Sequence, residues 1–142
     1  TGLAPEYAEY TGKPHKGPHQ YFYSDAYRVA ANIGLDSAWF GKTDINSTIA
    51  DNIQSLFAEI GFNLDDYYVY DIDGTRLDEK SLHPHELLAT NAQASLAANG
   101  PHIEQFVRAF WDLPLRKGAR RYYDNCLYMF ALLALSGIYR IY

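Results

Sequence analysis

The feature that most constrains this fold is an apolar stretch near the end of the chain, LYMFALLAL at 127–135. A helix over 122–135 would be apolar on nearly every side, and such a helix is normally buried by neighbours on most sides. The stretch is shorter than the about 20 apolar residues that cross a membrane, so we expect no membrane span. The chain is therefore predicted to form a row of antiparallel helix pairs whose last helix needs more neighbours than the chain itself supplies.

Four further helices are predicted from apolar residues at helical spacing. The clearest carries a single stripe from Ile45 to Ile60, with Thr43 before it as a cap and Gly61 after it as a stop. Ser24 is the expected N-cap of the first helix. In chain order, the predicted helices cover residues 24–40, 44–60, 84–99, 101–110 and 122–135.

The spacing of apolar residues changes in the middle of the chain. Residues 67–72 are rich in β-formers, Asp73-Gly74 is a hairpin turn signal, and 75–77 could form the return strand. The same segment also resembles a calcium-binding loop. That interpretation fails because Val69 and Lys80 would have to supply the two end ligands. We therefore predict a small β-hairpin and no calcium site.

Charge and composition exclude several classes of protein. The net charge is −5, and the basic stretch at 115–122 reads as a solvated turn, so we expect no nucleic-acid partner. The single cysteine, Cys126, lies in the apolar last helix and is expected to be a structural residue in a reducing compartment. With no signal-peptide pattern at the start, we expect a cytoplasmic protein. The first ten residues, TGLAPEYAEY, have the composition of an internal loop, which suggests a fragment.

Two pairs of histidines raise the question of a metal site. His15 and His19 form one pair, and His83 and His85 form the other. Both pairs lie beside prolines, and neither has the helical spacing with a third ligand that zinc needs. We expect polar loop or ligand contacts here, and neither a metal nor another cofactor.

Asp25 and Arg28 stand one turn apart at the head of the first predicted helix, behind the aromatic run YFY at 21–23. An acidic residue in a first helical turn stabilises that end by about 0.3–1 kcal/mol, so helix capping would explain Asp25 by itself. The alternative is chemical. A guanidinium beside Asp25 favours the ionised carboxylate, which could act as a general base for water among the surrounding tyrosines. The residues alone leave both interpretations open.

Three long segments resemble glycoside hydrolase family 8, most closely its members that release xylose from the reducing end of xylo-oligosaccharides. They are YFYSDAYRVAANIGLDSAWF at 21–40, SLHPHELLATNAQASLA at 81–97 and RRYYDNCLYMFALLALSGIYRIY at 120–142. Family members are toroids of six helix pairs. The resemblance implies an all-α chain, the C-terminal part of an (α/α)6 toroid with a small β-hairpin insertion. Residues 1–142 would then be the C-terminal portion of a single catalytic domain.

The resemblance also implies roles for individual residues. The family cleaves β-1,4 bonds with inversion, and the Asp of its aromatic-x-Asp-Ala-x-Arg pattern, here Asp25, is the general base. Arg28 would bind near this base and the cleaved sugar. Tyr122 and Tyr123 would line the subsite around the attacking water, and of these we favour Tyr123. Tyr23, beside the carboxylate, joins the expected substrate-binding set.

The segment Leu82-His83-Pro84 matches a loop that closes the leaving-group side in the reducing-end-specific members. His83 is expected to contact the hydroxyl of the reducing end. A wall that carries a hydrogen-bonding group would turn an open cleft into a pocket that selects one end of the sugar chain.

No segment matches the family's general acid, a Glu, or a further catalytic-site Asp, which lie in the N-terminal half of family members. Because general acid catalysis is worth about 10²–10⁴-fold, we expect the isolated chain to be nearly inactive. The expected partners are a xylo-oligosaccharide and the missing N-terminal half. Two alternatives are a noncatalytic carbohydrate-binding fragment with a tyrosine-rich surface, and a helical module whose apolar faces meet a partner protein.

Overall fold

A computed structural model describes residues 1–141 and shows five α-helices with one small sheet. The helices are α1 (Arg28–Phe40), α2 (Asp44–Ile60), α3 (Pro84–Ala94), α4 (Ile103–Trp111) and α5 (Arg121–Leu135). Two 3-10 turns, η1 (Ser24–Tyr27) and η2 (Leu64–Asp66), and two strands, β1 (Tyr68–Tyr70) and β2 (Arg76–Lys80), complete the elements. None of the helices in the described part of the chain has the length and apolar character to cross a membrane.

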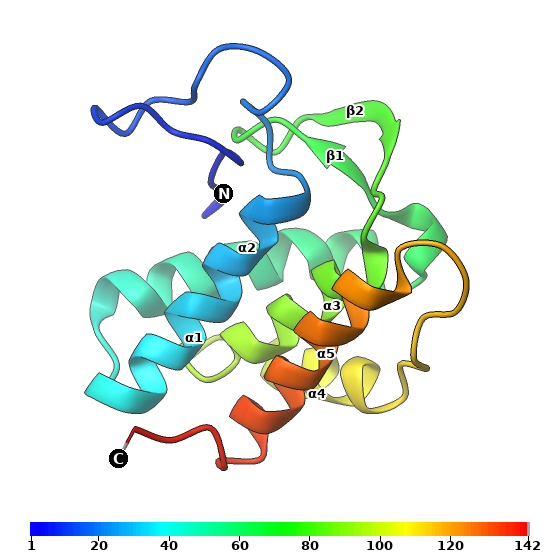
Figure 1. The fold of residues 1–142 in the computed structure, drawn as a ribbon. Helices are drawn as coiled ribbons and strands as arrows, with labels where there is room; N and C mark the ends of the chain where they lie inside the picture. The colour runs from blue at the N-terminus through cyan, green and yellow to red at the C-terminus, as the bar shows by residue number, and fades with distance from the viewer. Residues whose placement is uncertain (142) are drawn as a thin grey trace.

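The helices pack around α3, which contacts all four of the others (Figure 1). Every residue from Glu86 to Ala94 is buried, although this stretch contains Glu, Thr, Asn and Gln. α1 packs closely on α3 because Gly34 has no side chain: a Cβ there would lie 2.2 Å from the Gln93 carbonyl oxygen. The Gln93 amide donates to the Ala31 carbonyl, 3.0 Å away, and this joins the same two helices.

The last helix packs on the core with one face only. Leu127 and Ala131 face the core, whereas Met129, Phe130 and Leu132 are exposed in this chain. Within the described residues α5 is thus only partly buried, which agrees with the expectation that this helix needs more neighbours than the chain supplies. The reason is that α5 packs mainly on α3 and lies at an edge of the array (Figure 1).

The hairpin prediction is confirmed. β1 and β2 pair in antiparallel fashion, and the turn between them closes where Gly74 donates to the Asp71 carbonyl, 2.9 Å away. The Asp73 carboxylate accepts from the backbone N–H of Thr75 at 2.8 Å, as expected for a turn aspartate. Phe22 pairs with Tyr70 and so attaches the hairpin to the segment that leads into η1.

The helix boundaries predicted from the sequence are correct for α2 but not for the end of α3. Thr43 accepts a hydrogen bond from the backbone N–H of Asn46 at 3.2 Å, which confirms it as the N-cap of α2. α3 stops before its predicted end because side chains of α2 bind the backbone that follows. Ser47 donates to the Ala97 carbonyl at 2.8 Å, and an Asp51 oxygen accepts from Asn99 and from the glycine after it.

The start of the first helix differs from the prediction. Ser24 makes no capping hydrogen bond; it has a φ of 39°, and the chain enters the 3-10 turn η1 before α1 begins. A serine in this left-handed region is strained by roughly 1–3 kcal/mol, a feature that often accompanies functional sites. Glu6 occupies the expected capping place, since its Oε1 accepts from the backbone N–H of Asp25 at 3.4 Å. The N-terminal segment, through Glu6, thus supports the residue next to the strained position.

Candidate active site

The predicted base, Asp25, is held between two donors, Tyr123 and Arg28. The Tyr123 hydroxyl of α5 donates to Asp25 Oδ1 at 2.6 Å, and Arg28 Nη2 lies 2.8 Å from Oδ2. The Asp25 side chain is still 36% exposed. Because a carboxylate has about four acceptor positions, these two donors leave room for a water molecule. The arrangement suits a carboxylate that takes a proton from water.

Tyr123 connects α5 to η1, which lies almost 100 residues earlier in the chain: its contact with Asp25 spans 98 positions. Burial raises the pKa of its hydroxyl above the ordinary value, and the hydrogen bond to Asp25 acts in the same direction. The hydroxyl therefore stays protonated and donates to the carboxylate. Tyr123 also contacts the loop before α3, because its ring packs edge to face against the ring of His83, with centroids 4.9 Å apart.

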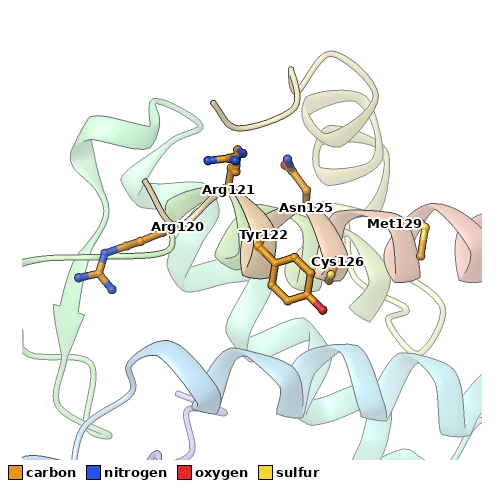
Figure 2. Close-up of a pocket in the computed structure, with 6 residues that line it drawn as sticks. All are labelled: Arg120, Arg121, Tyr122, Asn125, Cys126 and Met129. Atoms are coloured by element: carbon orange, nitrogen blue, oxygen red, sulfur yellow. The ribbon is translucent and has the colours of Figure 1, made fainter. Parts of the chain in front are cut away.

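The other expected tyrosines lie farther from the carboxylate. Tyr122 is 82% exposed and lines a shallow pocket of about 480 Å³ on the first turns of α5 (Figure 2). It also borders a groove of about 460 Å³ between α1 and α5, together with Arg28 and Tyr123. Tyr23 is half-buried, which raises its pKa, but within residues 1–141 neither Tyr23 nor Tyr122 hydrogen-bonds to Asp25. Of the expected tyrosines, only Tyr123 contacts the carboxylate.

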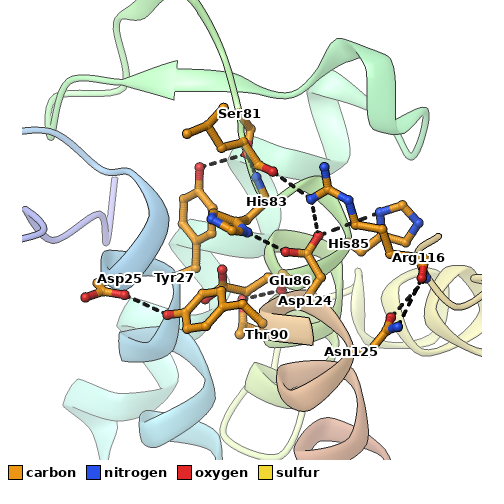
Figure 3. A network of polar contacts seen from close by, with 12 residues as sticks. Asp25, Tyr27, Ser81, His83, His85, Glu86, Thr90, Arg116, Asp124 and Asn125 are labelled. Atoms are coloured by element: carbon orange, nitrogen blue, oxygen red, sulfur yellow. Dashed lines mark hydrogen bonds and ion pairs between the residues drawn. The ribbon is translucent and has the colours of Figure 1, made fainter. Parts of the chain in front are cut away.

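A second carboxylate, Asp124, lies one residue after Tyr123 and is fully buried. Its Oδ1 lies 2.5 Å from His83 Nδ1, and its Oδ2 lies 2.6 Å from Arg116 Nη1 (Figure 3). Arg116 Nη1 also donates to the Leu82 carbonyl at 2.6 Å. The leaving-group-side loop predicted at residues 82–84 is thereby attached to α5 through a buried ion pair.

A third carboxyl group, Glu86 of α3, is buried beside this pair. Burial, followed by the charge of Asp124, raises its pKa to about 9, and Arg28 opposes the shift. Neither carboxyl oxygen of Glu86 has a hydrogen-bond partner in the part of the chain that the structure describes. At neutral pH Glu86 is therefore protonated, and Asp124 carries the negative charge of this buried cluster.

These three side chains could in principle hold a metal, since ligand atoms of His83, Glu86 and Asp124 lie within 4.8 Å of one another. Their contacts do not suit a cation. Arg116 already places a positive charge 2.6 Å from Asp124, and the raised pKa leaves Glu86 without a charge at pH 7. The residues fit a hydrogen-bonded network better than a metal centre.

Three further histidines, His15, His19 and His85, also have carboxylate neighbours. His15 Nδ1 lies 2.6 Å from Glu9, and His19 Nδ1 lies 2.5 Å from Glu6, the residue that also binds the backbone of Asp25. His85 lies 3.9 Å from Asp124, and burial lowers its pKa. The predicted polar contacts are confirmed for His15, His19 and His83, whereas His85 Nδ1 has no hydrogen-bond partner among the described residues.

Sequence reasoning missed Arg116, Asp124 and Glu86. Arg116 lies in the basic stretch that reads as a solvated turn, and that prediction is wrong for this residue because it pairs with buried Asp124. A signal for Asp124 did exist, because it shortly precedes the apolar stretch 127–135. A charged residue beside such a stretch is almost always paired when it is buried.

Comparison with known proteins gives long matches to one kind of enzyme. The chain is 54% identical over 146 residues to the reducing-end xylose-releasing exo-oligoxylanase Rex8A of Paenibacillus barcinonensis, and 49% identical over 149 residues to such an enzyme of Bifidobacterium adolescentis. The matches include 100% and 99% of this chain but 38% of each relative. No protein-family model matches the chain.

Solved structures agree with the sequence matches. The Paenibacillus barcinonensis enzyme complexed with xylose superposes with a TM-score of 0.95 at 54% identity, over 100% of this chain and 38% of that one. A second crystal structure of a reducing-end xylose-releasing exo-oligoxylanase complexed with xylose gives a TM-score of 0.93. The 142 residues are thus homologous, in sequence and in fold, to somewhat more than a third of such an enzyme.

Proposed function

We propose that this chain is the C-terminal part of an inverting glycoside hydrolase that releases xylose from the reducing end of β-1,4-xylo-oligosaccharides. The observation that supports this most directly is the partly exposed Asp25 carboxylate, bound by Arg28 at 2.8 Å and by Tyr123 at 2.6 Å. Relatives at 54% identity that carry this activity support the choice of substrate. The expected cytoplasmic location stays a prediction.

In this proposal Asp25 is the general base. It accepts a proton from a water molecule that attacks the anomeric carbon, while a carboxylic acid outside this chain protonates the leaving oxygen. Tyr123 and Arg28 orient the carboxylate, and both leave its outer lone pairs free for water. Tyr122 and Tyr23, which do not hydrogen-bond to Asp25 within residues 1–141, would contact the sugar from the rim.

His83 is proposed to face the leaving xylose. It follows Leu82 on the loop before α3, and Tyr123 separates it from Asp25 by one aromatic ring. A substrate whose scissile bond lies over Asp25 would therefore place its reducing-end unit near the loop. This geometry supports a pocket that admits one sugar unit beyond the cleaved bond.

The missing part of the domain is proposed to cover the exposed apolar side of α5. Met129, Phe130 and Leu132 are exposed there, and the chain spans about 38% of its relatives. The same surface would serve a helical interaction module, whose partner would then be a different protein. Noncatalytic sugar binding remains the other alternative.

Product analysis tests the proposal. We define the reconstituted domain as the Paenibacillus barcinonensis enzyme in which this chain replaces its homologous segment. Xylotriose is incubated with this protein, and proton NMR follows the anomeric signals. We expect xylose from the reducing end, with the new end of xylobiose born as the α anomer. A new end born as the β anomer, or no turnover by a folded domain, contradicts the proposal. The 142-residue chain alone, which lacks the acid, is the control.

A further inference from the structure

The buried Asp124 has two different donors on its two oxygens. Arg116 Nη1 contacts Oδ2 at 2.6 Å, and His83 Nδ1 contacts Oδ1 at 2.5 Å (Figure 3). A guanidinium can only donate, and it favours an ionised carboxylate, which can only accept. The hydrogen between His83 and Asp124 is therefore on the histidine, at Nδ1.

This assignment fixes the other nitrogen of the ring. When the imidazole is neutral, a hydrogen at Nδ1 leaves Nε2 with a free lone pair. Nε2 has no hydrogen-bond partner within residues 1–141, and the His83 side chain keeps 9% of its surface exposed. The ring cannot turn freely, because Tyr123 packs against it at 4.9 Å and the His83 backbone N–H binds Ser81 Oγ at 3.2 Å.

We propose that Asp124 is a positioning residue that fixes His83 in the tautomer whose Nε2 accepts a hydrogen bond from a hydroxyl of the reducing-end sugar. The inference rests on the proposed function, because it uses His83 as the contact to the leaving xylose. Asp124 itself touches no substrate. It acts through the imidazole, and Arg116 ensures that the carboxylate presents only acceptors.

The other charged groups around the cluster are consistent with this role. Glu86 is buried and protonated at neutral pH, so it does not add a second negative charge beside Asp124. His85 stands 3.9 Å from Asp124, too far for a hydrogen bond. Arg116 thus provides the close cationic partner of the carboxylate, and His83 completes the set of donors.

In the variant Asp124→Asn we expect the imidazole hydrogen of His83 to change its position. The amide has one accepting oxygen, and this must serve Arg116, which cannot accept. The amide NH₂ group then faces His83 Nδ1, so the imidazole hydrogen moves to Nε2. In the double variant Asp124→Asn/Arg116→Met, the amide oxygen is free to turn to His83, and the hydrogen returns to Nδ1. Asp112→Asn removes the same charge at an exposed position and is the matched control.

Two readouts are measured on the reconstituted domain. Nitrogen-15 NMR of histidine-labelled protein reports the tautomer, with the His83 signals assigned by their loss in His83→Gln. Steady-state kinetics with xylotriose and with borohydride-reduced xylotriose report recognition of the reducing end. For Asp124→Asn we expect the Nε2–H tautomer, a rise in KM for xylotriose of roughly tenfold, a smaller change in kcat and weaker discrimination between the two sugars.

The outcomes separate this inference from the proposed function. An Nε2–H tautomer in the unchanged protein overturns the inference without any variant. The inference can therefore be tested even if a variant folds poorly. A lowered kcat/KM in His83→Gln, with tautomer and KM unaltered in Asp124→Asn, overturns the inference alone. An unchanged kcat/KM in His83→Gln overturns the proposed contact between His83 and the sugar, and the inference with it.

Discussion

Asp25 and Asp124 have nearly the same partners and opposite surroundings. Each carboxylate has an arginine on one oxygen, at 2.8 and 2.6 Å, and a ring donor on the other, at 2.6 and 2.5 Å. The Asp25 side chain is 36% exposed, whereas that of Asp124 is 0% exposed. An exposed carboxylate can exchange protons with water and substrate, but a buried one can only hold its neighbours. Burial, more than the choice of partners, is the reason that we propose chemistry for Asp25 and positioning for Asp124.

The largest effect that tests this comparison is on turnover. Asp25→Asn removes the proposed base while preserving shape, so kcat of the reconstituted domain should fall by about 10²–10⁴-fold, with a small change in KM. Steady-state kinetics with xylotriose measure both constants. Asp112→Asn serves as the exposed control. Unchanged turnover would exclude Asp25 as the base, whereas lost turnover with retained sugar binding would argue against a noncatalytic role.

The free energy of unfolding should depend more on Asp124 than on Asp25, the reverse of the expected effect on turnover. Asp124→Ala leaves His83 and the partly buried Arg116 without their acceptor, and a buried donor without its acceptor costs about 1–3 kcal/mol of unfolding free energy, more when it is charged. Asp25→Ala breaks a partly exposed pair, which is worth about 0–1 kcal/mol. Urea unfolding of the two variants of the reconstituted domain gives the comparison. Equal losses would mean that the difference in burial does not separate the two sites.

Glu86 should make stability depend on pH. Its folded pKa of about 9 lies above the ordinary value of 4.5, so the folded state holds the extra proton between these values, and stability falls as pH rises through that window. In Glu86→Gln this contribution is absent. As the pH increases, the difference in unfolding free energy, Glu86→Gln minus unchanged protein, should therefore rise by up to about 1.4 kcal/mol per pH unit.

Urea unfolding of both proteins at pH 5, 6.5 and 8 measures this slope. Glu104→Gln, at an exposed position of α4, is the matched control and should leave the pH dependence as it is. Parallel pH profiles for Glu86→Gln and the unchanged protein would show that Glu86 ionises normally in the folded state.

The smallest effect concerns the connection between the two sites. Tyr123→Phe keeps the ring against His83 but removes the hydroxyl that donates to Asp25 at 2.6 Å. Loss of one such hydrogen bond is worth about 1 kcal/mol, so kcat should fall roughly five- to tenfold. The NMR signals of His83 should stay in place, because its contact with Asp124 is untouched. A change in the His83 tautomer would show that the hydroxyl couples the two carboxylates.

Parts of the site could be predicted from the sequence because they are local. Asp25 and Arg28 stand three residues apart on one turn, so their ion pair follows from helix geometry alone. The contact between Asp25 and Tyr123 spans 98 positions, and the sequence offered only the resemblance to a known family as a reason to bring them together. Among the tyrosines, composition gave no way to tell Tyr123 from the exposed Tyr122.

The helices and the hairpin follow from the sequence, because periodicity, Thr43 and Asp73-Gly74 act within a few residues. Which groups lose contact with water depends instead on how distant segments pack together. α3, whose polar residues leave no clear apolar stripe, lies buried at the centre. α5, which is apolar on nearly every side, lies at an edge of the helical array. Burial depends on what packs from elsewhere in the chain, and it is burial that made Glu86 neutral and left Asp124 to hold His83.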